Sequence, residues 1–325
     1  MLYPNLSRAV EGYLLEVGAS GRSPNTLRNY RNELKRLIRW GGDCPIDEVT
    51  SEYLEKYMFY LKNDFRIIRI ATTEVKPRKL SQKSIYNAWG ALSGFCKWFS
   101  REYQLDNPFH LQPVKFYTKP ILPLKEDEVE QLLHACKVVP KFPAHLASYE
   151  ASRTTCKRDR AIVLTLLDTG IRVGELCDIN VGDLDMTTGR ITVTGKGEKT
   201  RFVYLGKVAR QAVWSYHAER FPKENPSKDE PLFADKDDIH RITRYGVRML
   251  VQRLGKRGGV NGVHPHKFRH TFAVEFLRNG GNVFELQQLL GHTDLEMVKR
   301  YVMLAQIDLE VVARKASPAD HWRLR

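Results

Sequence analysis

The residues of this chain that could carry chemistry are basic side chains and one tyrosine, and they lie in four short blocks. TGIRVGEL contains Arg172, TGKGEKTR contains Lys196, HPHKFRHTFA contains His266 and Arg269, and GHTDLEMVKRYV contains His292 and Tyr301. Glu175 follows Arg172 by three positions, so both are expected on one helix face, where the carboxylate can hold the guanidinium. Gly170 is expected to end the preceding helix, which places Arg172 near a new helix start, a position that suits an anion.

Together these side chains have the types that transesterification of a phosphodiester requires without a metal. A tyrosine oxygen can attack phosphorus, and because the phenol pKa is about 10, the phenoxide is a tolerable leaving group in the reverse direction. Arginines stay charged and donate paired hydrogen bonds to the oxygens on which negative charge accumulates. A lysine on a glycine-flanked turn can protonate the departing sugar oxygen, an effect worth roughly 10²- to 10⁴-fold.

Taken one at a time, these residues have simpler interpretations. Arg172 alone is more often an ordinary surface arginine, Lys196 a solvated turn lysine, and Tyr301 an aromatic at the edge of a core. A core or capping role is expected for at least one of His264 and His270. The histidines also raise the question of zinc, but HExxH is absent and an arginine within the cluster opposes a metal, so no metal is expected.

Composition and charge favour a globular DNA-binding protein. The net charge is +14, and it is shared: residues 1–119 hold 19 Lys and Arg against 12 Asp and Glu, and residues 120–325 hold 33 against 26. A cationic surface suits phosphate backbones. There is no apolar run of the roughly 18 residues that a membrane span needs and no secretory signal pattern, so a cytoplasmic location is expected. Five cysteines without a CxxC pair predict reduced thiols.

The spacing of apolar residues predicts two domains that are mainly α-helical with a small antiparallel β-sheet. Four amphipathic helices are expected at about 6–18, 24–41, 50–62 and from 81 onward, with residues 63–79 a loop or short hairpin. Four prolines within residues 108–123 indicate a linker at 113–123, which leaves domains at 1–112 and 124–325. The second domain is expected to contain a buried helix around DRAIVLTLLDTG and a hairpin of 190–195 with 200–205. Further helices are expected at about 207–221, 240–255, 267–279, 282–290, 294–304 and 307–315.

With the blocks LLDTGIRVGELCDINVGDLD, VTGKGEKTRFVYL, HPHKFRHTFA and LLGHTDLEMVKRYV in this order, the chain resembles the tyrosine recombinase, or phage integrase, family. The resemblance covers nearly the whole chain. It implies a helical, SAM-like core-binding domain and an integrase-type catalytic domain that close around DNA as a C-shaped clamp. By the same resemblance, the activity is that of a metal-independent, cofactor-free, site-specific DNA recombinase.

The resemblance also implies a role for each candidate residue. Arg172 and Arg269 would grip the scissile phosphate. Lys196 would protonate the leaving 5′ oxygen, His266 would act as an acid–base or phosphate-binding group, and His292 would hydrogen-bond the phosphate. Glu175 would support the site by holding its neighbours in place without contacting the phosphate, and Tyr301 would form the 3′-phosphotyrosyl link.

The assembly that the family implies is a homotetramer on two double-stranded target sites, exchanging strands through a Holliday junction. The helix at 307–315 would dock on a neighbouring protomer, and accessory DNA-bending proteins are a further class of partner. Two other functions stay open: a DNA-binding regulator, because FELQQLLGHTDLEMVKRYV has the pattern of a helix-turn-helix, and a type IB-like topoisomerase with the same chemistry. A metal-dependent nuclease ranks last, and insensitivity to EDTA would exclude it.

Overall fold

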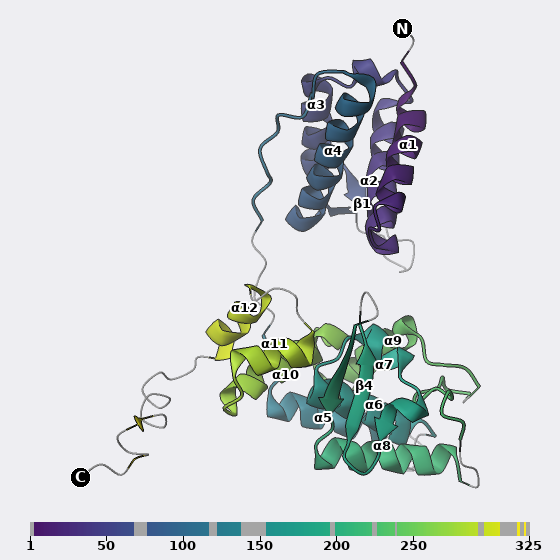
Figure 1. The fold of residues 1–325 in the computed structure, drawn as a ribbon, viewed down its shortest axis with the longest axis vertical. Coiled ribbons are helices and arrows are strands. Elements are labelled where there is room, and N and C mark those ends of the chain that lie inside the picture. Colours follow the sequence, from purple (N-terminus) through teal and green to yellow (C-terminus); the bar gives the residue numbers. More distant parts are fainter. Residues whose placement is uncertain are drawn as a thin grey trace, which may run out of the picture. The chain divides into compact units, whose positions relative to one another are not determined.

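The computed structural model describes residues 3–67, 77–116, 122–137, 154–195, 199–222, 226–237, 239–291 and 296–305, together with 317, 318 and 322. The chain divides into two compact units, Met1–Lys119 and Pro120–Arg325 (Figure 1). Among the described residues, none of the helices combines the length and apolar character that a membrane crossing requires.

The first unit is a bundle of the four predicted helices. Ser23 caps the second of them by accepting a hydrogen bond from the backbone N–H of Thr26 at 3.2 Å, and Pro24 is its first residue, as predicted. Residues 66–67 and 78–79 form a short antiparallel hairpin, and the residues between them lie outside the described part. The elements are α1 (Leu6–Ala19), α2 (Pro24–Gly41), α3 (Ser51–Asn63), β1 (Arg66–Ile67), β2 (Arg78–Lys79) and α4 (Gln82–Tyr103).

Aromatic side chains dominate the core of this bundle. Tyr13 on α1 packs edge-on against Phe95 on α4, with ring centroids 5.6 Å apart, and Phe95 also contacts Phe99 and Trp98. Phe95, Phe99 and Tyr57 are fully buried. Rings of this size bury large apolar areas, so a few of them stabilise a small bundle.

The second unit combines helices with a three-stranded antiparallel sheet of order β3-β4-β5. The predicted hairpin is confirmed, with pairing from Arg190 and Tyr204 to Thr194 and Thr200. Strand β3 was not predicted, because two residues are too few to show an alternating pattern. The elements are α5 (Glu126–Lys137), α6 (Cys156–Thr169), α7 (Val173–Asp178), β3 (Leu184–Asp185), β4 (Arg190–Thr194), β5 (Thr200–Tyr204), α8 (Lys207–Arg220), α9 (Arg244–Gly258), α10 (Pro265–Arg278), α11 (Val283–Leu290) and α12 (Glu296–Ala305).

Two of these helices begin at residues that differ from the expected ones. α9 begins at Arg244 rather than near 240, because the hydroxyl of Thr243 accepts the backbone N–H of Gly246 at 3.0 Å. α10 begins at Pro265, two residues early, because Nδ1 of His264 accepts the N–H of Lys267 at 3.2 Å. His264 therefore has the expected capping role. The predicted helix at 307–315 lies outside the described residues.

Two apolar clusters hold the second unit together. The larger surrounds α6, which is buried along most of its length and packs against α5, α8 and α10. The smaller lies where α10, α11 and α12 meet, and includes Leu286, Leu290, Val298 and Tyr301. The candidate site lies beside this second cluster, so the packing of these three helices positions it.

Candidate active site

The turn between α6 and α7 brings Arg172 and Glu175 together. Gly170 ends α6 with a φ of 60°, and a Cβ there would lie 2.4 Å from Phe272, so glycine is required. Arg172 is the N-cap of α7; its backbone N–H donates to Glu175 Oε2 at 2.7 Å and its Nη1 donates to Oε1 at 2.9 Å. The predicted contact between the two side chains is present.

A third arginine, Arg201 on β5, also holds Glu175, and sequence reasoning missed it. Its Nη1 and Nη2 donate to Oε1 and Oε2 of Glu175 at 3.0 and 2.8 Å, a two-bond grip on the carboxylate. Burial by itself would raise the pKa of Glu175, but the hydrogen bonds from Arg201 and Arg172 outweigh burial and hold this pKa below the ordinary glutamate value. Glu175 is therefore ionised at neutral pH.

Arg269 on α10 is buried and joins two helix ends. Its Nη1 donates to the carbonyl oxygen of Gly170 at 2.8 Å, and its Nη2 donates to that of Leu290 at 2.7 Å. Burial and the neighbouring charge of Arg172 lower the pKa of Arg269 to about 10. That value still leaves the guanidinium charged at neutral pH.

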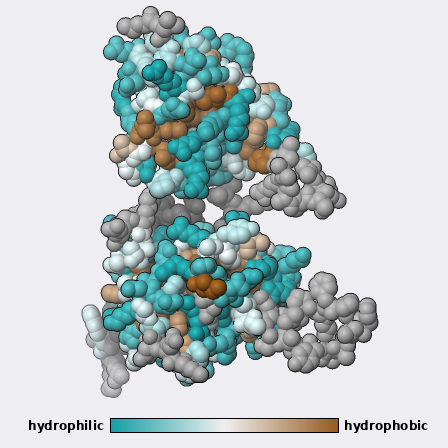
Figure 2. All heavy atoms as spheres, turned by 90° about the vertical axis from the view of Figure 1, so that its right-hand side faces the viewer, coloured by the Kyte–Doolittle hydropathy of each residue, from teal (hydrophilic) through white to brown (hydrophobic). Residues whose placement is uncertain are grey.

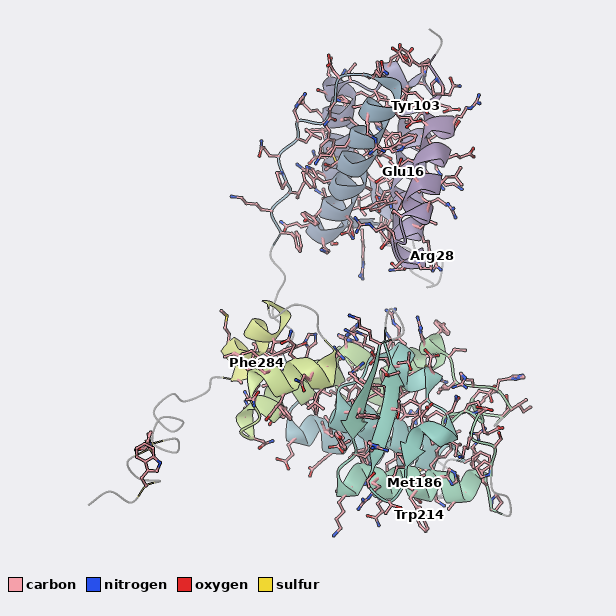
Figure 3. All side chains as sticks on the ribbon, in the orientation of Figure 1. Glu16, Arg28, Tyr103, Met186, Trp214 and Phe284 are labelled. Carbon is pink, nitrogen blue, oxygen red and sulfur yellow. The ribbon has the colours of Figure 1, made fainter. Side chains whose placement is uncertain are left out.

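All three guanidiniums meet at the C-terminal end of α11. Phe284, labelled in Figure 3, lies in the first turn of this helix, so the arginines meet its opposite end. Carbonyl groups at a helix C-terminus lack partners within the helix and carry partial negative charge, which suits cations. Arg201 Nε, Arg269 Nη2 and Arg172 Nη2 donate to the carbonyls of Leu289, Leu290 and Gly291 at 2.7, 2.7 and 3.4 Å.

Two histidines extend the site along one face of α10. The rings of His266 and His270 lie 6.4 Å apart, as expected for positions four residues apart on a helix. Burial, Arg269 and His264 lower the pKa of His266, and burial with the neighbouring His266 lowers the pKa of His270 to about 4. Both imidazoles are therefore neutral at pH 7.

Tyr301 on α12 is buried in the smaller apolar cluster and packs against the ring of His270. Its ring lies 5.4 Å from that of His270, and it is near enough to Arg269 to influence the pKa of that guanidinium. Only 3% of Tyr301 is exposed. Its interpretation as a core aromatic describes its packing correctly, yet the packing puts the phenol beside the basic cluster.

Lys196 and His292 lie outside the described residues, but the residues before them are at the site. A Cβ at Gly195 would lie 3.6 Å from both Arg201 Nη1 and Glu175 Oε1. Gly291, with a φ of 62°, accepts the hydrogen bond from Arg172. The structure thus brings together five of the seven predicted residues: Arg172, Glu175, His266, Arg269 and Tyr301.

The arrangement can bind and polarise an anion. Three guanidiniums and a single carboxylate leave a net positive charge at a helix end, with two neutral imidazoles and a phenol alongside. In the segments that the structure describes, there is no group of three side chains able to ligate a metal ion. A phosphate diester carries one negative charge and oxygens that accept such donors.

Two protein-family profiles match the chain. One, described as the phage integrase family, matches residues 123–306, and the other, described as the phage integrase SAM-like domain, matches residues 6–113. The tyrosine recombinase XerC of Staphylococcus saprophyticus subsp. saprophyticus is 32% identical over 308 residues, which cover 91% of this chain and 92% of the relative. The tyrosine recombinase XerC of Staphylococcus aureus (strain MSSA476) is 29% identical over 299 residues, or 91% of each protein.

Solved structures share the fold. A Tn1549 transposon integrase in complex with a circular intermediate DNA matches with a TM-score of 0.70 at 20% identity, over 97% of this chain and 99% of that one. A lambda integrase tetramer bound to a Holliday junction matches with a TM-score of 0.68 at 17% identity, over 95% of this chain and 80% of that one. The TM-scores show that these proteins share the fold of this chain, and at identities this low the matches show the fold alone.

Proposed function

The chain belongs to the phage integrase family, whose tyrosine recombinases are DNA strand-transfer enzymes, and we propose that it recombines specific DNA sites through a 3′-phosphotyrosyl intermediate. The phenolic oxygen of Tyr301 forms a bond to phosphorus while the bond from phosphorus to the 5′ oxygen breaks. The phenol loses its proton and the 5′ oxygen gains one. Reversal with a 5′ hydroxyl from another strand completes the exchange without nucleotide hydrolysis.

One observation carries this proposal: Tyr301 lies beside His270 and close to Arg269, one of three guanidiniums that meet at the end of α11. Arg172 and Arg269 bind the non-bridging oxygens of the scissile phosphate, where negative charge grows as phosphorus becomes five-coordinate. Glu175 orients Arg172 through the hydrogen bond to its Nη1. Fixed donors of this kind need no rearrangement when the charge develops, so they favour the transition state over the ground state.

The remaining candidate residues complete the proton transfers. Lys196 protonates the leaving 5′ oxygen from the turn after Gly195. His292 donates to the phosphate from the position after Gly291. A neutral His266 next to Arg269 can accept a proton and, once protonated, return it, as acid–base catalysis requires.

The proposed substrate and assembly are those that membership of this family implies. Residues 1–112 form the core-binding domain, residues 113–123 the linker and residues 124–325 the catalytic domain, which together close around double-stranded DNA as a clamp. Four protomers act on two duplexes, and residues 307–315 of one protomer dock on the next. As the docking site we propose a groove of about 1510 Å³ in the second unit, whose lining includes the apolar residues Leu124, Leu133, Leu164, Phe272, Phe276 and Met303.

The decisive test is Tyr301→Phe with a nicked DNA substrate that traps the covalent intermediate. The variant retains the ring and its packing but has no oxygen to attack phosphorus, so it should bind DNA as the wild type does and yield no adduct that survives denaturation. The matched control is Tyr245→Phe on α9, an exposed tyrosine, which should form adduct at the wild-type rate. Adduct formation should persist in EDTA. An undiminished adduct in Tyr301→Phe would overturn the assignment.

A further inference from the structure

Arg201 is largely buried and donates from its whole guanidinium. Its side chain is 13% exposed, and every one of its three nitrogens donates: Nη1 and Nη2 to Glu175 and Nε to the carbonyl of Leu289. It therefore links a strand, the first turn of α7 and the end of α11. A guanidinium used in this way has little capacity left for a ligand.

Arg172 differs in both respects. Its side chain is 39% exposed, and its contact with Gly291 is long, at 3.4 Å. Among the described residues its guanidinium donates from the two terminal nitrogens only, with one bond of 2.9 Å to Glu175. Arg172 can thus turn towards a phosphate while it keeps one contact with the carboxylate.

The buried carboxylate of Glu175 makes Arg201 necessary. A buried charge is costly unless it is paired and hydrogen-bonded. If Arg201 were absent, Arg172 would remain as the nearest cation able to compensate Glu175 through short bonds, and pairing with the carboxylate would compete with binding of the phosphate.

Arg201 also lies between the two segments that lead into Lys196 and His292. A Cβ at Gly291 would be 3.2 Å from its Nη1, and one at Gly195 would be 3.6 Å from the same atom. Its Nε bond to Leu289 fixes β5 to the end of α11. The guanidinium of Arg201 therefore lies close to both Gly195 and Gly291, the residues that precede Lys196 and His292.

We propose that Arg201 is a positioning residue, which holds Glu175 and the end of α11 so that the guanidinium of Arg172 stays available to the scissile phosphate. This inference rests on the proposed function, and it adds a residue that the sequence blocks did not single out. Arg201 itself does not contact the phosphate. It acts through Glu175 and Arg172.

The charged groups around Glu175 define a pH test. They are Arg172 at the start of the same helix, Arg201 on β5 and Arg269 on α10. The charge of Glu175 partly offsets the burial that lowers the pKa of Arg269. α9 contributes Arg244, which pairs with Asp178 at the other end of α7 at 3.7 Å. When Arg201 is removed, two of the hydrogen bonds that lower the pKa of Glu175 are lost while burial remains, so this carboxyl should titrate at higher pH.

The experiment uses Arg201→Gln in the full chain. The rate of adduct formation at pH 7 should fall roughly 10- to 100-fold, the range for loss of hydrogen bonds to a charged group. The acid side of its pH profile should move to higher pH, because a protonated Glu175 no longer holds Arg172 in the orientation that suits the phosphate. Arg201→Lys keeps the positive charge but has a single nitrogen in place of the two that donate to Glu175, so it should recover part of the rate of adduct formation. The matched control is Arg190→Gln on the neighbouring strand, where the guanidinium lies over Phe202, and it should leave rate and profile unchanged.

A second measurement does not depend on activity. Carboxyl-labelled glutamate in the DNA-free protein, with Glu175→Gln to identify its signal, reports the titration of Glu175 by NMR. An unchanged Glu175 titration in Arg201→Gln, or a rate loss that is uniform across pH, would show that Arg201 only supports the fold. If the wild type formed no adduct with any DNA, the proposed function would fail, and the NMR titration would still decide whether Arg201 controls Glu175.

Discussion

The two units of this protein bury different kinds of side chain. Six polar or charged residues are buried in the described part of the chain, Asp159, Thr165, Thr169, Glu175, Arg269 and Thr271, and all of them belong to the second unit. The first unit is built on rings such as Tyr57, Phe95 and Phe99. On the face drawn in Figure 2, hydrophobic residues gather on the first unit, and the second is mostly hydrophilic.

The aromatic core of the first unit serves stability, whereas the buried charges Glu175 and Arg269 of the second unit serve the candidate site. Packed rings stabilise a bundle by burying apolar area, whereas a site for phosphate needs charge that is held in place before the substrate arrives. The second unit keeps its charges buried by satisfying them with helix-end carbonyls and with one another. Substitutions in the two units should therefore have effects of different kinds.

After the loss of adduct expected for Tyr301→Phe, the largest expected effect is on catalysis and comes from Lys196, in the second unit. Lys196→Ala should slow cleavage by roughly 10²- to 10⁴-fold, because the 5′ oxygen then leaves without a proton. Replacing that oxygen by sulfur should restore the rate, since a thiolate leaves without an acid. The rates of trapped-adduct formation on the two substrates measure this, with Lys199→Ala on the same turn as control. A lack of rescue by sulfur would remove Lys196 from this role.

In the first unit the expected effect is on stability. Phe95→Ala removes a fully buried ring that contacts three others, and should lower the free energy of unfolding by about 3–5 kcal/mol. Urea unfolding of the full chain, followed by tryptophan fluorescence, measures this, because three of the five tryptophans, Trp40, Trp89 and Trp98, lie in this unit. Phe59→Ala, at a position 63% exposed, should change it by less than about 0.5 kcal/mol. Equal losses in the two variants would contradict the aromatic core.

The smallest predicted effect is a pH dependence confined to the second unit. An unfolded histidine takes a proton near pH 6.5, while the folded pKa of His270 is about 4. The unfolded state therefore binds more protons in this window, and stability should fall as pH falls from about 6.5 towards 4, by on the order of 1 kcal/mol at pH 5 after allowance for solvent screening. His270→Asn should remove this part of the loss between pH 7 and 5 in urea unfolding. A loss of the same size in the variant would assign it to other groups.

Much of the local structure was predictable because it depends on neighbours in the sequence. The four helices of the first unit, the cap at Ser23, the end of α6 at Gly170 and the hairpin of β4 with β5 follow from periodicity and turn chemistry. So do the contacts Arg172–Glu175 and His266–His270, three and four residues apart on a helix. The candidate residues themselves were named from their types and from the family resemblance.

Arg201 shows what the sequence alone could not provide. It lies 26 residues after Glu175 and 88 before Leu289, and in the pattern TRFVYL it is an ordinary polar position on a strand. The only signal was its place in the second matching block, close to Lys196. Periodicity determines which residues share a face of one element, but it does not say which elements will meet.

The amino-acid sequence therefore determined most of the elements, the cap at Ser23 and the types of group available for phosphate chemistry, since each depends on spacings of a few residues. The tertiary structure decided that three arginines meet at the end of α11, that Glu175 is shared between two of them and that Tyr301 packs beside His270. Those contacts join α7, β5, α10, α11 and α12, and they depend on how the two apolar clusters of the second unit pack these elements together.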